Sequence, residues 1–203
     1  MNPKWITPLV LLLGIALWTD AGAVPIIPSA ADWSVSVTTI VNRNGQTGSL
    51  ASVTDLAGLD GVQLSYSQPT GGFGVGTSTL LRTYSTTYSG LAADIPLAVD
   101  INAFTGFFGN QFKVDYFVNA TTTNLVPLTD VEPGFADTFS LSLSLSPGDA
   151  WGFRVLAGNY DSGSGVSGTV RVRAVPEPGT LVLTGVGLLA LAVIRRRGAV
   201  RGW

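Results

Sequence analysis

Asp130 and Glu132 are the two carboxylates whose spacing comes closest to that of a chemical site. On a strand, residues two apart share one face, and two such carboxylates can bind Ca²⁺ or act as the pair of a glycoside hydrolase. Pro133 and Gly134 follow directly, so we expect a solvated loop instead of a catalytic cleft. Two further pairs flank predicted turns and are weaker candidates: Asp55 with Asp60, and Asp94 with Asp100.

Aromatic side chains offer a second kind of candidate site. Tyr84 and Tyr88 are four residues apart and therefore share a strand face with Arg82, where the rings could stack on a sugar. Core packing is the alternative for these rings, and we favour it. Phe107 and Phe108, in a loop flanked by glycines, present the same two alternatives.

Composition excludes several classes of chemistry. The chain of 203 residues has no Cys and no His, so it can form no disulfide, thiolate zinc site, cysteine nucleophile or Ser-His-Asp triad. The segment Asp161–Gly165 has a single acid where an EF-type calcium loop needs several, and it predicts a hairpin turn. An isoelectric point near 4.9 without a basic stripe argues against nucleic acid.

We therefore expect no catalytic residue, no cofactor and no metal ligand, and we predict that the protein is not an enzyme. A calcium site built from Asp residues that are distant in sequence stays open at this point.

The middle of the chain predicts β-strands. Apolar and polar residues alternate with period two, and the alternating segments are separated by Gly, Pro, Asn and Asp. The clearest segments are Trp33–Val37, Phe112–Val118, Phe139–Leu145, Trp151–Val155 and Val170–Ala174, with Val62–Tyr66 and Leu97–Ile101 as further candidates. About nine to eleven strands and a short helix or turn near Pro28–Asp32 predict an all-β, antiparallel β-sandwich that is jelly-roll-like.

The N-terminal residues have the pattern of a signal peptide. Lys4 precedes an apolar run, Leu9–Trp18, and the small residues Ala21 and Ala23 follow it. We expect a signal helix and cleavage after Ala23, which implies export of the rest of the chain.

The C-terminal residues predict a membrane segment. Pro176, Glu177 and Pro178 end the last strand because proline cannot donate to a sheet. The 16 residues Gly179–Ile194 carry no charge, slightly fewer than the about 20 that a spanning helix needs. The basic residues Arg195, Arg196 and Arg197 follow at once and predict a cytoplasmic end by the positive-inside rule. The transmembrane helix would then leave the preceding domain outside the cell membrane.

This order of a Pro-Glu-Pro tripeptide, a short apolar segment and a basic cluster resembles the PEP-CTERM sorting signal over about residues 175–197. The resemblance implies recognition by a membrane-embedded exosortase, a transpeptidase-like partner that cuts near the tripeptide and transfers the domain to a surface acceptor. It assigns the recognition tripeptide to Pro176, Glu177 and Pro178, and the stop signal to Arg195, Arg196 and Arg197. It also implies a Gram-negative bacterium that makes exopolysaccharide and biofilm matrix.

These patterns divide the chain into a signal peptide (1–23), an exported β-sandwich domain (24–174) and a sorting tail (175–203). The domain has a formal charge of −5, although the whole chain has −2 and a mean hydropathy of +0.39. We expect an inner-membrane-anchored intermediate and then a cell-surface or extracellular protein with a structural or interaction role. The alternatives are a glycan-binding module, which exopolysaccharide would suit as partner, and, more remotely, a glycoside hydrolase.

Overall fold

The computed structural model describes residues 26–42, 50–68, 78–105, 109–131, 134–159 and 165–175, together with Gly187. A 3₁₀ turn, η2 (Ala30–Asp32), comes before the strands. The strands are β1 (Ser34–Asn42), β2 (Leu50–Asp55), β3 (Gly61–Ser67), β4 (Ser78–Thr87), β5 (Ala93–Thr105), β6 (Gln111–Val118), β7 (Thr121–Asp130), β8 (Phe135–Leu145), β9 (Ala150–Asn159) and β10 (Val166–Ala174).

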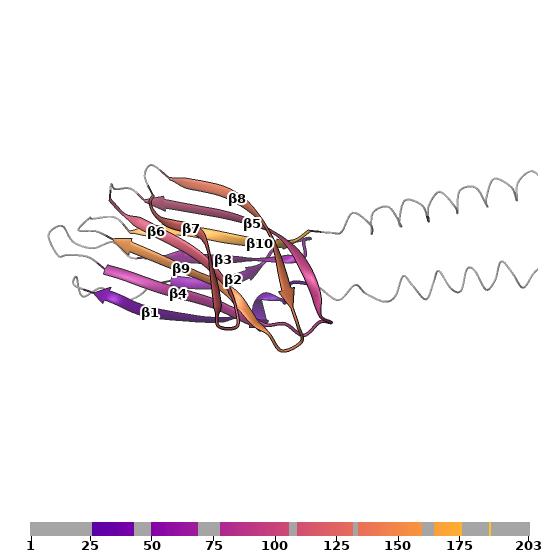
Figure 1. The fold of residues 1–203 in the computed structure, drawn as a ribbon. Coiled ribbons are helices and arrows are strands. Elements are labelled where there is room, and N and C mark those ends of the chain that lie inside the picture. The colour runs from indigo at the N-terminus through magenta and orange to yellow at the C-terminus, as the bar shows by residue number, and fades with distance from the viewer. Residues whose placement is uncertain are drawn as a thin grey trace, which may run out of the picture.

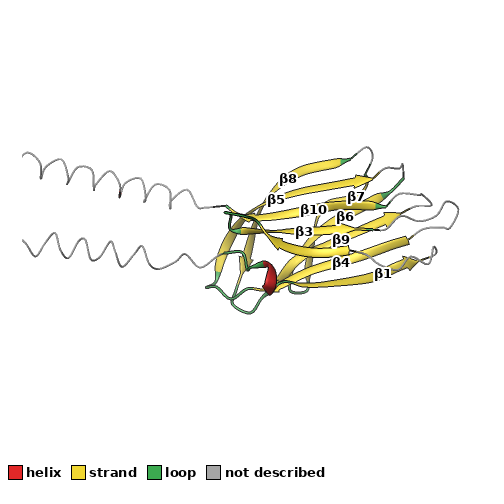
Figure 2. Ribbon diagram, turned by 180° about the vertical axis from the view of Figure 1, so that it is seen from behind, coloured by secondary structure: helices red, strands yellow, loops and turns green. Residues whose placement is uncertain are grey.

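These strands form two antiparallel sheets packed face to face, so the predicted all-β sandwich is confirmed (Figures 1 and 2). Sheet A has the order β1-β4-β9-β6-β7, and sheet B has the order β2-β3-β10-β5-β8. Most connections cross from one sheet to the other, and only β2–β3 and β6–β7 stay within a sheet. The 3₁₀ turn lies where a short helix or turn was expected.

The core lies between the sheets and follows the period-two patterns. On β5 and β10, alternate residues such as Val99, Ile101, Val170 and Val172 are buried, and the residues between them face solvent. Trp151 on β9 lies at one end of this core and makes an edge-to-face contact with Trp33, with ring centroids 5.2 Å apart. The amphipathic strands thus fold because each sheet hides one face against the other.

Two strands depart from the expected burial. Val35 and Val37 were expected on a buried face with Trp33, but their exposed fractions are 38% and 43% because β1 is the edge strand of sheet A. Phe117, on the expected polar face of β6, is only 5% exposed because the guanidinium of Arg154 lies over its ring, 4.8 Å from the centroid.

The expected signal helix and C-terminal transmembrane helix lie outside the described residues. Within the part of the chain that the structure describes, no helix has the length and apolar character needed to cross a bilayer.

Candidate functional site

Asp60 and Asp55 hold the N-terminal segment of the described domain. The carboxylate of Asp60 accepts hydrogen bonds from the backbone N–H groups of Ile26 (2.8 Å) and Ile27 (3.0 Å). The carboxylate of Asp55 accepts one from the N–H of Ala30 at 2.7 Å. This pair of carboxylates, considered above as a weak chemical candidate, therefore has a structural role.

The C-terminal end of the domain is held beside it. The N–H of Ala174 donates to the carbonyl of Asp60 (2.9 Å), and the N–H of Val175 donates to the carbonyl of Pro96 (2.9 Å). Val175 is thus hydrogen-bonded to the sheet, and Pro176 comes next in the sequence. Ile26 and Ala174 both bond to Asp60, so the two ends of the described domain lie close together.

The individual residues predicted for sorting and cleavage lie outside the described residues. They are the tripeptide Pro176, Glu177 and Pro178, the basic cluster Arg195, Arg196 and Arg197, and the small residues Ala21 and Ala23. Their roles stay predictions.

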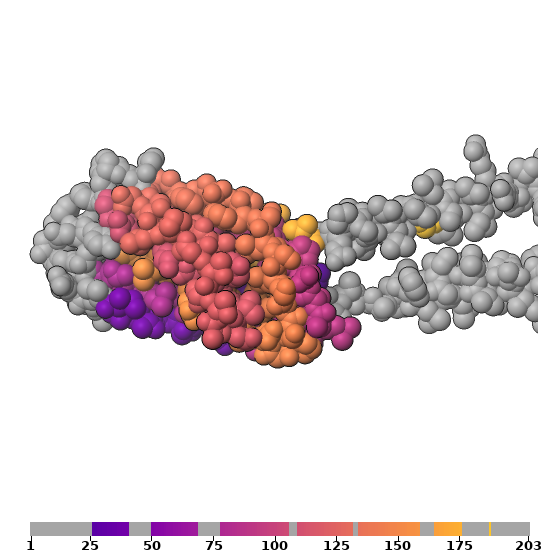
Figure 3. All heavy atoms as spheres, viewed as in Figure 1, coloured from indigo at the N-terminus to yellow at the C-terminus, as the bar shows by residue number. Residues whose placement is uncertain are grey.

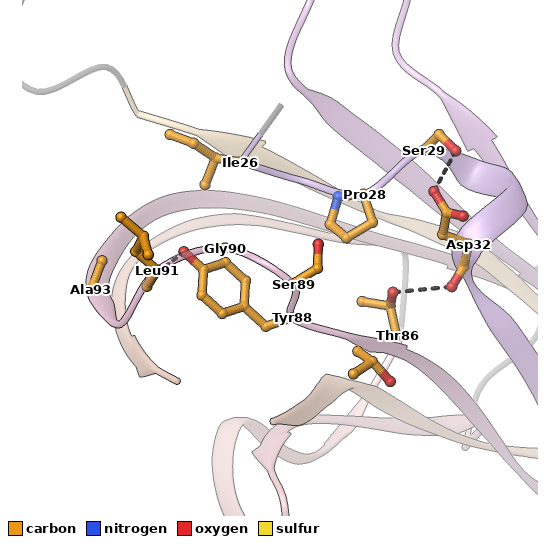
Figure 4. Close-up of a pocket in the computed structure, with 11 residues that line it drawn as sticks. Ile26, Pro28, Ser29, Asp32, Thr86, Tyr88, Ser89, Gly90, Leu91 and Ala93 are labelled. Carbon is orange, nitrogen blue, oxygen red and sulfur yellow. Dashed lines mark hydrogen bonds between the residues drawn. The ribbon is translucent and has the colours of Figure 1, made fainter. Parts of the chain in front are cut away.

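An open pocket of about 970 Å³ lies beside Ile26, at the end of the sandwich where Asp60 holds the N-terminal segment (Figure 4). Its wall is formed largely by apolar groups, among them Ile26, Pro28 and Leu91. Several of its polar groups are hydrogen-bonded within the wall: Tyr88 donates to the carbonyl of Leu91 (2.8 Å), and Ser29 donates to the carboxylate of Asp32 (2.7 Å). These three side chains therefore help to hold the loops around the pocket.

The proposed aromatic face of Tyr84, Tyr88 and Arg82 is buried. Tyr84 and Arg82 are both fully buried on the inner face of β4, and Tyr88 lies just beyond the end of that strand. Tyr84 offers no surface to a sugar, and the core-packing alternative holds for it, whereas Tyr88, although only 8% exposed, lines the pocket described above. Phe107 and Phe108 lie outside the described residues.

Arg82 is a charge inside the core. Its Nη2 donates to the carbonyl of Ser67 (3.1 Å), and its guanidinium lies 5.8 Å from the ring centroid of Tyr66. Burial lowers the pKa of Arg82, and the neighbouring phenols of Tyr84 and Tyr66 partly oppose this effect.

The two phenols beside Arg82 are hydrogen-bonded to backbone. Tyr84 donates to the carbonyl of Ser65 (2.6 Å), and Tyr66 donates to the carbonyl of Asn102 (3.2 Å). Burial raises the pKa of both phenols, against a smaller lowering by the Arg82 charge. Arg82, Tyr84 and Tyr66 thus form a polar cluster within the core. The sequence did not reveal it because the alternation around Arg82 also fits a solvent-exposed strand face.

The remaining carboxylates do not gather. Asp130 ends β7 and accepts a hydrogen bond from Gln111 (2.8 Å), so it belongs to a strand and not to the expected loop, while Glu132 lies outside the described residues. Asp100 forms an ion pair with Arg173 (2.8 Å), and Asp94 bonds to Ser144. Across the described ranges, no three Asp or Glu residues are close enough to hold a metal ion. Asp161 to Ser164 lie outside those ranges.

The outer face of sheet B is a polar platform that sequence reasoning did not single out. Its central residues bond across strands: Arg171 donates to Gln63 (2.8 Å), and the backbone of Thr169 donates to the Asn102 side chain (3.1 Å). Phe104 stands on this face next to Ser167 and is 63% exposed. This face therefore combines an exposed aromatic ring with amide and hydroxyl groups.

Comparison with known proteins gives matches of two kinds. Among solved structures, TmCBM61 in complex with β-1,4-galactotriose is 8% identical with a TM-score of 0.39, over 73% of this chain and 91% of that one. The CBM22-1 xylan-binding domain of Paenibacillus barcinonensis Xyn10C is 8% identical with a TM-score of 0.33, over 74% and 90%. A family 35 carbohydrate-binding module from Clostridium thermocellum is 16% identical with a TM-score of 0.28, over 74% and 98%.

No curated protein matches the chain. The match that bears on function concerns residues 174–197, which fit the model of the PEP-CTERM protein-sorting motif. This range begins at Ala174, the last residue of β10, and it contains the tripeptide and the basic cluster predicted above. The chain carries a PEP-CTERM protein-sorting motif, which implies export, a membrane-anchored intermediate and exosortase-dependent sorting to the surface.

Proposed function

We propose that this protein is an exported envelope or matrix protein that an exosortase-type enzyme processes at its C-terminal motif. The match of residues 174–197 to the PEP-CTERM protein-sorting motif carries this proposal. In it, Pro176, Glu177 and Pro178 are read by the enzyme, and Arg195–Arg197 keep the tail anchored until it is cut. The inner membrane is the partner only before processing.

The position of the motif directly after the folded domain supports processing at the tripeptide. Val175, the last residue of the described domain, is hydrogen-bonded to the carbonyl of Pro96, and the tripeptide follows it directly in the sequence. Two prolines bias the backbone of such a segment towards an extended form, which lowers the entropy that an enzyme must remove on binding it. The recognition segment would thus begin at the edge of the folded domain.

We further propose a structural or interaction role for the domain, without catalysis. Two of the three carboxylate pairs found in the sequence support this role, because Asp55 and Asp60 are tied to backbone groups and Asp94 and Asp100 lie six residues apart on β5. The domain then acts by its surface once it is displayed in the envelope or the biofilm matrix.

The processing step is tested by the Glu177→Gln variant in the native organism, with Glu132→Gln as the matched control. We expect Glu177→Gln to accumulate in the membrane fraction at the mass of the unprocessed form, whereas Glu132→Gln reaches the surface like the natural protein. Surface delivery of both variants to the same extent would overturn the role assigned to Glu177.

Glycan binding is a second candidate function, and the exposed Phe104 ring on the polar face of sheet B is the observation that favours it. A polysaccharide pull-down with residues 24–175 tests it. Phe104→Ala should abolish retention, while Leu91→Ala, an exposed apolar residue lining the pocket at the end that holds Ile26, should leave it unchanged. Equal retention of both variants, or none by the natural domain, would rule this face out as a glycan site.

A further inference from the structure

β8 is an exposed edge strand that has few of the features by which proteins keep such edges unpaired. It pairs with β5 along its whole length, from Phe135 opposite Ala103 to Leu145 opposite Ala93, and it ends the order of sheet B. Figure 1 places β8 at the upper border of the sandwich, and Figure 3 shows this border at the molecular surface. An open edge offers unpaired N–H and C=O groups to another strand.

The other three edge strands are protected. The register of β1 with β4 shifts between Thr39 and Val41, which marks a bulge. β2 has only six residues and ends at Asp55. β7 contains Pro127, and its pairing with β6 is irregular at two places. β8 has 11 residues, no proline and no register shift.

The sequence of β8 defines one segment that is free to pair. Residues 138–146 carry no charge and no proline, and Asp137 and Pro147 bound them. A charge and a proline at an edge both oppose strand addition. These two residues are each five positions from Ser142, so the open segment is symmetric about that residue.

Alternate backbone donors of this segment are turned towards the open edge. The N–H of Thr138 donates to the carboxylate of Asp137 at 2.7 Å instead of to a neighbouring strand. Directions alternate along an antiparallel strand, so the N–H groups of Ser140, Ser142 and Ser144 face the same side. Their side chains lie on the exposed outer face of sheet B.

We propose that two copies of this chain pair through β8, antiparallel and about a two-fold axis at Ser142. In this register Ser142 lies opposite itself, Leu141 opposite Leu143, and Phe139 opposite Leu145. Serines then continue the polar outer face and leucines the apolar inner face across a joined ten-stranded sheet. A shift of two residues would set Asp137 or Pro147 inside the paired segment.

The occupant of this edge is a second copy because β8 is complementary to itself. A partner strand must be uncharged and must alternate apolar and small polar residues in the same phase, and within the described strands the segment 138–146 is the one that does so without a bulge or proline. The two-fold operation makes a closed dimer because each sheet B has one such edge. The inference goes beyond the proposed function and does not depend on the tail.

Sedimentation equilibrium on residues 24–175, which contain both sheets and the core, tests the proposal. The natural domain should form a dimer. Ser142→Lys sets two like charges opposite each other at the axis and should weaken dimerisation at least tenfold. Ser52→Lys is the matched control, since Ser52 is exposed on the outer face of β2, at the opposite edge of the same sheet. It should dimerise like the natural domain.

A charge-reversal pair separates a lost interface from a misfolded variant. Ser142→Lys and Ser142→Glu should each be monomeric and folded by circular dichroism, and a mixture of the two should restore a dimer. A natural domain that stays monomeric at millimolar concentration would overturn the proposal. So would a dimer that Ser142→Lys leaves intact, or one that Ser52→Lys weakens equally.

Discussion

The carboxylate of Asp60 accepts a hydrogen bond from the backbone N–H of Ile27 at 3.0 Å, although 33 residues separate the two in sequence. Ile27 is buried, so this bond closes the N-terminal segment over the core. The carbonyl of the same Asp60 accepts from Ala174, the last residue of β10. One residue in the turn before β3 therefore fixes both ends of the described domain.

Asp60→Asn should lower the free energy of unfolding by about 1–3 kcal/mol, because its NH2 group replaces one of the two carboxylate oxygens and cannot accept from the N–H of Ile26 or Ile27. Urea unfolding followed by tryptophan fluorescence measures this change. Asp130→Asn is the control, since Asp130 accepts from Gln111 at the exposed surface, and it should stay within about 0.5 kcal/mol. Equal effects of the two substitutions would contradict the structural role of Asp60.

The buried phenols predict alkaline instability. Because burial raises the pKa of Tyr66 and Tyr84 in the folded state, the unfolded chain loses these protons first. The stability that the protonated phenols contribute is complete below pH 10 and is lost as the pH rises above it. Each tyrosine should contribute a slope of about 1.4 kcal/mol per pH unit.

The double variant Tyr66→Phe/Tyr84→Phe checks this origin. Its unfolding free energy should fall less steeply between pH 10 and pH 11.5 than that of the natural domain. The two slopes should differ by the contribution of the two missing phenol protons. A pH profile with the same slope in both proteins would assign the alkaline loss to other groups.

Gly152→Ala should destabilise the domain by about 1–3 kcal/mol. A methyl group at Gly152 would collide with the backbone carbonyl of Tyr84 on β4, and neither strand can move without breaking its pairing. Gly134→Ala is the matched control, because its methyl group would meet the carbonyl of Ala103 at an ordinary 3.7 Å. Thermal unfolding compares the two, and an equal loss of stability in both would show that close approach is not the cause.

The period-two patterns predicted the strands because burial on one face dictates alternation. That is why Val170 and Val172 on β10 were placed correctly in the core. The same pattern does not tell an edge strand from a central one, so the exposure of Val35 and Val37 on β1 could not be predicted.

The contacts that define the two ends of the domain could not be predicted either. Asp60 and Ile27 meet only through the folded sandwich, and the sequence shows there no more than a turn at Asp60 and Gly61. Arg82 was placed on the right strand, but its burial depends on Tyr66 of the facing sheet. In contrast, the sorting motif is linear, so its residues and spacing were sufficient to find it.

The C-terminal mass of the mature surface protein tests the central claim most directly. Mass spectrometry of the protein released from the cell surface should find a C-terminus within residues 176–179, and deletion of the partner sorting enzyme should leave the full tail in the membrane fraction. A mature surface protein that still ends at Trp203 would contradict sorting at this motif and establish a plain membrane anchor.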